Sequence, residues 1–135
     1  MRTVFNIEMD DRTVLWPEGK FLSHVTVQEG LDLTVRLDAV FMFNESRDDT
    51  LIAALCADDA LELGRCLLEA VYQGRTQHLL SETAKIAVVF NPNGFVARFG
   101  EGGATKELFL ASPAILRLSQ GILRAVDAIG APAAN

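Results

Sequence analysis

The clearest alternation of apolar and polar positions runs from Leu31 to Phe43. Leucine, valine, alanine and phenylalanine occupy the odd positions, while polar residues such as Asp32 and Arg36 occupy most of the even ones. A period of two is typical of a strand with one face in the core and the other in water. The segment therefore predicts a half-buried strand, of the kind found in antiparallel sheets covered by helices on one side.

A β-hairpin is predicted between Lys85 and Phe99. Two apolar segments flank Asn91-Pro92-Asn93-Gly94, and these residue types favour a tight turn. A four-residue loop best separates large apolar side chains from the remainder, because a one-residue slip would move every side chain to the other face. The predicted cross-strand pairs are Phe90 with Phe95, Val88 with Ala97, and Ile86 with Phe99.

Shorter apolar or alternating segments predict further strands at residues 3–9, 13–16, 21–28 and 106–110. Helical spacing of apolar residues begins at Ser46, has a second start at Asp59 and stops at Gly74. This region predicts two abutting helices or one kinked helix. A last helix is predicted from Ser112-Pro113 to Gly130.

Together these elements predict one α+β domain over residues 1–130, followed by a frayed tail at 131–135. We expect a two-layer fold in the order βββ-α-βββ-α. Its antiparallel sheet would have about five or six strands, with two main helices packed on one face. Inspection of the sequence reveals no internal repeat.

Charge narrows the classes of partner. The net charge is -6, and fourteen acidic against six basic residues through Gly74 give a balance of -8, whereas the rest of the chain has four against six, or +2. A chain without a Lys/Arg cluster lacks the main source of affinity for nucleic acid and anionic lipid. We therefore expect neither nucleic acid nor membrane as a partner. No stretch has the character of a signal peptide, which predicts a cytoplasmic protein.

The residues that could carry chemistry have simpler structural interpretations. Ser23 and His24 are adjacent in a predicted strand, so their side chains should point to opposite faces and be unable to pair as nucleophile and base. Cys56 and Cys66 lack metal-ligand spacing and are expected to be reduced, buried thiols. His78 is the only other imidazole, and no histidine pair at helical spacing suggests a metal site.

Two other patterns also point to structure. The acidic pairs Asp48-Asp49 and Asp58-Asp59 precede predicted helices, where carboxylates cap free N–H groups, and Asp10-Asp11 sits in a predicted turn. The glycine-rich segment at 100–106 lacks the order of a phosphate-binding loop and is followed by a predicted strand. We therefore expect no metal and no cofactor.

The second face of the predicted sheet carries apolar residues where polar ones are expected. If the long strand and the hairpin are neighbours, these residues form an exposed patch that suits a protein partner; alternatively, a helix or the N-terminal strands cover it. The candidate interface residues are Val40, Met42, Ala87, Val89 and Val96.

The function predicted from these observations is a non-catalytic protein–protein interaction module, self-associating as a homodimer through its sheet. The alternative is a small enzyme or ligand-binding protein with a pocket between the main helix and the sheet. In that case His24 or His78 would be the base that titrates near neutral pH.

Overall fold

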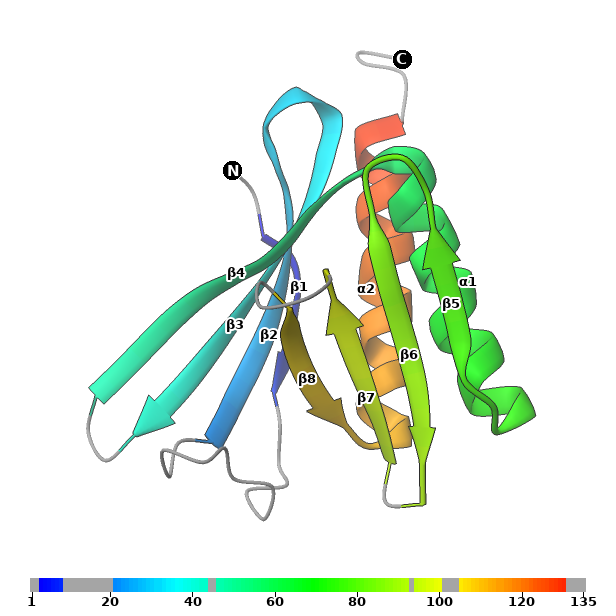
Figure 1. Cartoon of the computed structure of the whole chain (residues 1–135). Coiled ribbons are helices and arrows are strands. Elements are labelled where there is room, and N and C mark those ends of the chain that lie inside the picture. Colours follow the sequence, from blue (N-terminus) through cyan, green and yellow to red (C-terminus); the bar gives the residue numbers. More distant parts are fainter. Residues whose placement is uncertain (1–2, 9–20, 44–45, 93, 101–104, 131–135) are drawn as a thin grey trace.

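The computed structural model describes residues 3–8, 21–43, 46–92, 94–100 and 105–130. Within them the strands form two antiparallel sheets, sheet A in the order β1-β2-β3-β4 and sheet B in the order β5-β6-β7-β8 (Figure 1). In the chain, one helix follows the last strand of each sheet. The elements are β1 (Thr3–Glu8), β2 (Phe21–Glu29), β3 (Thr34–Phe43), β4 (Ser46–Cys56), α1 (Ala57–Gln73), β5 (Gln77–Leu80), β6 (Lys85–Asn91), β7 (Gly94–Phe99), β8 (Lys106–Leu110) and α2 (Ser112–Gly130).

The predicted α+β class, with antiparallel strands and two helices, is confirmed. The single sheet of about five or six strands is wrong, because the described strands form two sheets of four. The sequence did not predict β4 and β5 as strands. Each half of the chain therefore has one strand more, within the described residues, than was predicted there. The expected strand at 13–16, the turn at Asp10-Asp11 and the tail at 131–135 lie outside the described residues.

The segment from Ser46 is a strand and not the predicted helix. It forms β4, paired along its whole length with β3. The register shifts between Leu37 and Asp38, so that Ile52 is an extra residue in β4. This bulge breaks the alternation and buries Ile52 and Leu55, three positions apart, which imitates the spacing of a helix. The helix itself begins at Ala57 and ends as predicted at Gly74, whose backbone is left-handed.

The long alternating strand begins later than predicted. Leu31–Leu33 form a short 3₁₀ turn in which Leu31 and Leu33 are 77% and 68% exposed. Asp32 and Leu33 both have positive φ, 56° and 59°, and this left-handed pair reverses the chain between β2 and β3. From Thr34 the prediction holds, with buried core positions at Val35, Leu37, Ala39 and Phe41.

The hairpin register is confirmed. β6 and β7 pair Phe90 with Phe95, Val88 with Ala97, and Ile86 with Phe99. Asn91 and Gly94 also pair, so the connection is two residues shorter than the predicted loop while the register is unchanged.

In the residues that the structure describes, each half of the chain has four strands followed by a helix. Each helix contacts the strands of the other half more than those of its own half. Among the strands, α1 contacts mainly β5 and β6 although it follows sheet A, and α2 contacts mainly β1 and β2 although it follows sheet B. The helices also pack on each other, where the Ser119 hydroxyl donates a 2.8 Å hydrogen bond to the carbonyl oxygen of Gly64. The order of the described elements is therefore the same in both halves, although the sequence shows no repeat.

The repeat extends to the helix core positions. Ser119 and Gly64 are 55 positions apart. The same separation relates three pairs of fully buried side chains: Leu63 with Leu118, Leu67 with Ile122, and Ala70 with Ala125.

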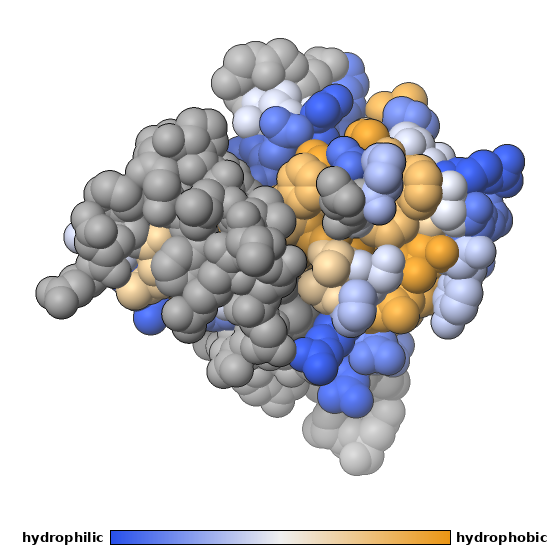
Figure 2. Space-filling model, turned by 90° about the horizontal axis from the view of Figure 1, so that it is seen from below, coloured by the Kyte–Doolittle hydropathy of each residue, from blue (hydrophilic) through white to orange (hydrophobic). Residues whose placement is uncertain are grey.

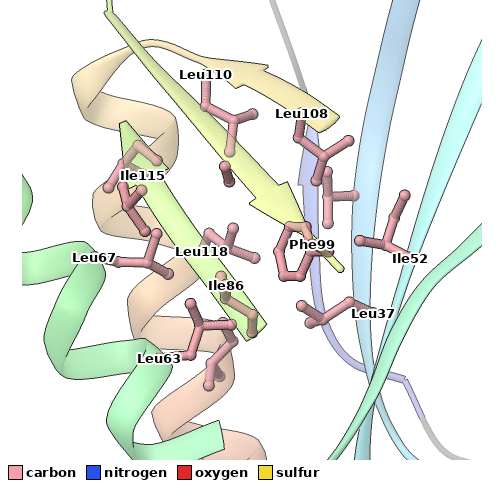
Figure 3. Close-up of a cluster of buried hydrophobic side chains, with 14 of the residues drawn as sticks. Leu37, Ile52, Leu63, Leu67, Ile86, Phe99, Leu108, Leu110, Ile115 and Leu118 are labelled. Atoms are coloured by element: carbon pink, nitrogen blue, oxygen red, sulfur yellow. The ribbon is translucent and has the colours of Figure 1, made fainter. Parts of the chain in front are cut away.

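One hydrophobic core joins the sheets and helices. Side chains of both sheets and both helices meet in the cluster drawn in Figure 3, including Leu37 from β3, Phe99 from β7, Leu63 from α1 and Leu118 from α2. Packing the inner sheet faces against the inner helix faces removes these apolar side chains from water, which stabilises the fold.

The left-handed turn provides a stability test. We expect Leu33→Gly to raise the free energy of unfolding by about 1 kcal/mol, because glycine has no β-carbon to strain a positive φ. The extra freedom of glycine in the unfolded chain offsets part of the gain. Urea denaturation measures the change. Leu31→Gly is the matched control, since Leu31 is equally solvent-facing but has no positive φ; a similar gain in both variants would contradict the explanation.

The helix exchange provides a second test. A fragment of residues 1–74 contains sheet A and α1 but lacks α2, so the buried face of β2, with Val25 and Val27, would lie open to water. We expect this fragment and residues 75–135 each to lack a cooperative thermal transition by circular dichroism, and an equimolar mixture to regain one. Cooperative unfolding of residues 1–74 alone would show that the halves do not depend on each other.

Candidate functional site

The outer face of sheet B carries a cross-strand apolar row. Val89 on β6 pairs with Val96 on β7, which pairs with Phe109 on β8, and all three side chains are partly exposed. The next row holds Ala87, Arg98 and Glu107, with an Arg98–Glu107 ion pair of 3.3 Å. We call Ala87, Val89, Val96 and Phe109 the sheet B patch.

The structure brings together three of the five predicted interface residues. Ala87, Val89 and Val96 share the outer face of sheet B. Val40 and Met42 lie on β3 of sheet A, which does not pair with the hairpin, and Val40 is buried.

Phe109 belongs to the patch but was missed. The signal was available in the sequence: Leu108 and Leu110 alternate as core positions of β8, so the large apolar residue between them had to face outward.

Apolar surface continues around the lower end of sheet B. Seen from below, apolar side chains gather on the side of the molecule where sheet B and the helices lie (Figure 2). Phe90, near the end of β6, is 47% exposed and packs edge-to-face on Phe95 with ring centroids 5.7 Å apart. Phe90 shares the face of Val88 and Phe95, opposite to the sheet B patch, so its exposed ring does not extend the patch.

The outer face of sheet A is polar and hollowed. A half-open pocket of about 330 Å³, which we call the sheet A pocket, lies over β2, β3 and β4. Its lining residues are Thr26, Gln28, Arg36, Asp38, Val40, Arg47, Asp49 and Leu51. The predicted pocket position, between the main helix and the sheet, is instead occupied by buried side chains such as Leu63 and Leu67.

Two arginine–aspartate pairs form the charged part of this pocket. On β3 the guanidinium of Arg36 donates to Asp38 through Nε at 2.9 Å and Nη2 at 3.0 Å. On β4 Arg47 donates to Asp49 through Nε at 2.7 Å. The hydrogen bond from Arg47 and, to a smaller extent, the charge of Arg47 lower the pKa of the Asp49 carboxyl. Asp49 is thus a strand residue in an ion pair, and its predicted role as a helix cap is wrong.

Ser23 and His24 contact each other, contrary to the sequence-based expectation. Ser23 Oγ lies 3.2 Å from His24 Nδ1. The register of β2 shifts between Leu22 and His24, and this bulge turns two adjacent side chains toward each other. Neither residue lines the sheet A pocket.

Asp59 ties α1 to the turn between β5 and β6. The carboxylate is buried and accepts hydrogen bonds from the hydroxyls of Thr83 at 2.6 Å and Ser81 at 3.0 Å. These bonds, the one from Thr83 most of all, lower the pKa of Asp59. The Asp58-Asp59 pair does lie in the first turn of α1 as predicted, but Asp59 also links distant segments.

The thiols differ in their surroundings. Both cysteines are free. Cys66 is buried as predicted, whereas Cys56, next to the start of α1, is exposed, so the prediction that Cys56 is buried is wrong. Burial raises the pKa of the Cys66 thiol.

Across the described ranges, no three His, Cys, Asp or Glu side chains are placed to hold a metal ion. Neither of the two described helices has the length and apolar character needed to span a membrane.

Comparison with known proteins adds no relative. No protein-family model, no curated protein and no solved structure matches the chain.

The buried carboxylate generates a prediction. We expect Asp59→Ala to lower the free energy of unfolding by about 1–3 kcal/mol, because two hydroxyl donors lose a charged acceptor. Chemical denaturation at neutral pH measures the loss. Asp58→Ala is the control, since Asp58 has the neighbouring helix position and lacks the contacts to Ser81 and Thr83.

The effect should depend on pH. A lowered pKa in the folded state means that ionised Asp59 stabilises the fold above the ordinary aspartate pKa of about 3.9, and that this contribution is lost as pH falls through the lower folded value. The difference between the wild-type protein and Asp59→Ala should therefore shrink in acid. A difference that stays constant down to pH 2 would contradict ionisation as its source.

Proposed function

We propose that this protein is a non-catalytic interaction module that associates with a second copy of itself through the sheet B patch. The observation that carries the proposal is the cross-strand row of Val89, Val96 and Phe109 on a face turned away from both helices. Apolar side chains placed side by side gain free energy when a partner removes them from water.

Charge supports a second copy as the occupant. The part of the chain that forms sheet B and α2 has a balance of +2, while the part that forms sheet A and α1 has a balance of -8. Contact of sheet B with sheet B therefore leaves the acidic halves away from the interface. A contact through sheet A would bring like charges together, which opposes association.

The Arg98–Glu107 pair makes the surface self-complementary. In a two-fold interface each copy presents the same groups, and a residue of one copy meets its complement on the other. Arg98 and Glu107 lie side by side in the row next to Val89 and Val96 and are about half exposed. Arg98 of one copy can therefore face Glu107 of the other without burying an unpaired charge.

The extent of the patch indicates a modest affinity. A stable interface buries about 800 Å² on each partner, which four side chains of one sheet face do not supply. We expect a reversible dimer in the micromolar range.

The catalytic alternative has less support. Ser23 and His24 are in contact, and His24 pairs with Val40 across β2 and β3. Neither residue is among those that line the sheet A pocket, and both lie on the other sheet from the sheet B patch.

Sedimentation equilibrium tests the dimer. We expect the wild-type protein to populate a dimer at high micromolar concentration, and Val89→Asp and Phe109→Asp each to give a monomer, because a carboxylate would be desolvated at the interface. Leu31→Asp is the control: it places the same charge at an exposed leucine on the β2–β3 turn and should leave the dimer intact.

Circular dichroism should show all three variants folded. A wild-type monomer at high micromolar concentration, or a dimer that survives both substitutions in the patch, would overturn the proposal.

A further inference from the structure

We propose that the sheet A pocket binds a small zwitterion carrying both a carboxylate and an ammonium group, in the size class of a free α-amino acid. This site is on the opposite half of the molecule from the sheet B patch and does not depend on the proposed dimer.

The sheet A pocket is a half-open hollow over β2, β3 and β4. Its volume of about 330 Å³ is at the small end of the range for ligand sites, about 300–1,000 Å³. Val40 lies between the core residues Ala39 and Phe41 of β3, so its side chain is on the outer face of the sheet. Only 3% of Val40 is exposed, because the surrounding side chains of the pocket cover it. A ligand there would rest on an apolar floor within polar walls.

Strand register sets the order of the charges. Asp38 on β3 is opposite Leu51 on β4, and Val40, two residues on, is opposite Asp49. The two carboxylates are therefore diagonal neighbours near the centre, while Arg36 lies beyond Asp38 and Arg47 lies beyond Asp49. Along the strand direction the charged residues are therefore in the order Arg36, Asp38, Asp49 and Arg47, with two positive charges outside and two negative charges inside.

This order selects a molecule with both charges. Two arginines and two aspartates give the lining a formal balance of zero, so it attracts no net charge. A simple anion near either arginine would also meet a carboxylate, and a simple cation near either carboxylate would meet a guanidinium. A zwitterion can satisfy both neighbours at once.

Each arginine keeps donors for such a ligand. Arg36 and Arg47 use Nε and Nη2 for their aspartates, and in the part of the chain that the structure describes their Nη1 groups donate to no protein acceptor. A guanidinium has five N–H donors and binds carboxylates through paired bonds. The existing bonds to aspartate already hold the side chains in place, which reduces the ordering cost of binding.

The remaining lining offers contacts for a ligand side chain. Gln28, across from Arg36, presents an amide at one wall, and Leu51 presents an apolar surface at the other. These groups would set the preference among zwitterions.

Binding can be followed by ¹H–¹⁵N NMR on the full chain with three matched probes. L-alanine carries both charges, propionate lacks the ammonium group and ethylammonium lacks the carboxylate. L-glutamine extends the zwitterion with an amide. We expect saturable shifts of amides at 26–28, 36–40 and 47–51 with L-alanine or L-glutamine, and only weak, non-saturating shifts with the two single-charge probes. No saturation with either amino acid at tens of millimolar, or equal response to propionate or ethylammonium, would overturn the proposal.

Variants locate the site. Because a hydrogen bond to a charged group is involved, Arg47→Gln and Asp38→Asn should each weaken zwitterion binding at least about tenfold. Arg98→Gln removes an arginine of similar exposure from the sheet B ion pair and should leave binding unchanged. Val89→Asp should also bind normally, which separates this site from the dimer. Retained dispersion of the spectra shows that the variants are folded; if Arg47→Gln and Arg98→Gln behave alike, the pocket is not the site.

Discussion

Mutual coverage of the two sheets by exchanged helices is the constraint on which the rest of the structure depends. Each sheet has an apolar inner face, and the helix that covers it comes from the other half of the chain: α2 for sheet A and α1 for sheet B. Apolar burial is the main favourable term in folding, so neither half completes its core without the other. The close approach of the helices, with Ser119 bonded to the carbonyl of Gly64, holds the two exchanged elements together.

The same arrangement explains why both candidate sites are on outer sheet faces. Both helices pack on the inner side, so nothing in the exchange covers the outer face of either sheet, and the two faces have different chemistry. On sheet A, paired charges surround a pocket with Val40 at its floor; on sheet B, Val89, Val96 and Phe109 form an apolar row. We propose a small ligand with two charges for the first face and an apolar partner surface for the second.

Local irregularities in the strands shape the polar face. The bulge at Ile52 lets β4 follow β3 over its full length while it sends an extra side chain to the core. The bulge before His24 turns Ser23 and His24 toward each other. Both depend on pairing with a neighbouring strand, so a rule of strict alternation along one strand cannot reveal them.

The sequence by itself determined the local elements whose patterns were regular: the alternating core of β3 from Val35 to Phe41, the hairpin register around Phe90 and Phe95, and the end of α1 at Gly74. It also placed Val89 and Val96 on one face. Only the tertiary structure decided that Ser46–Cys56 is a strand, that the strands divide into two sheets, and that Val40 lies away from the hairpin. The physical reason is that periodicity reports which side of an element meets the core, whereas strand partners and helix positions depend on contacts between residues far apart in the chain. The charge pattern of the pocket belongs to this second class, because it arises from the register between β3 and β4.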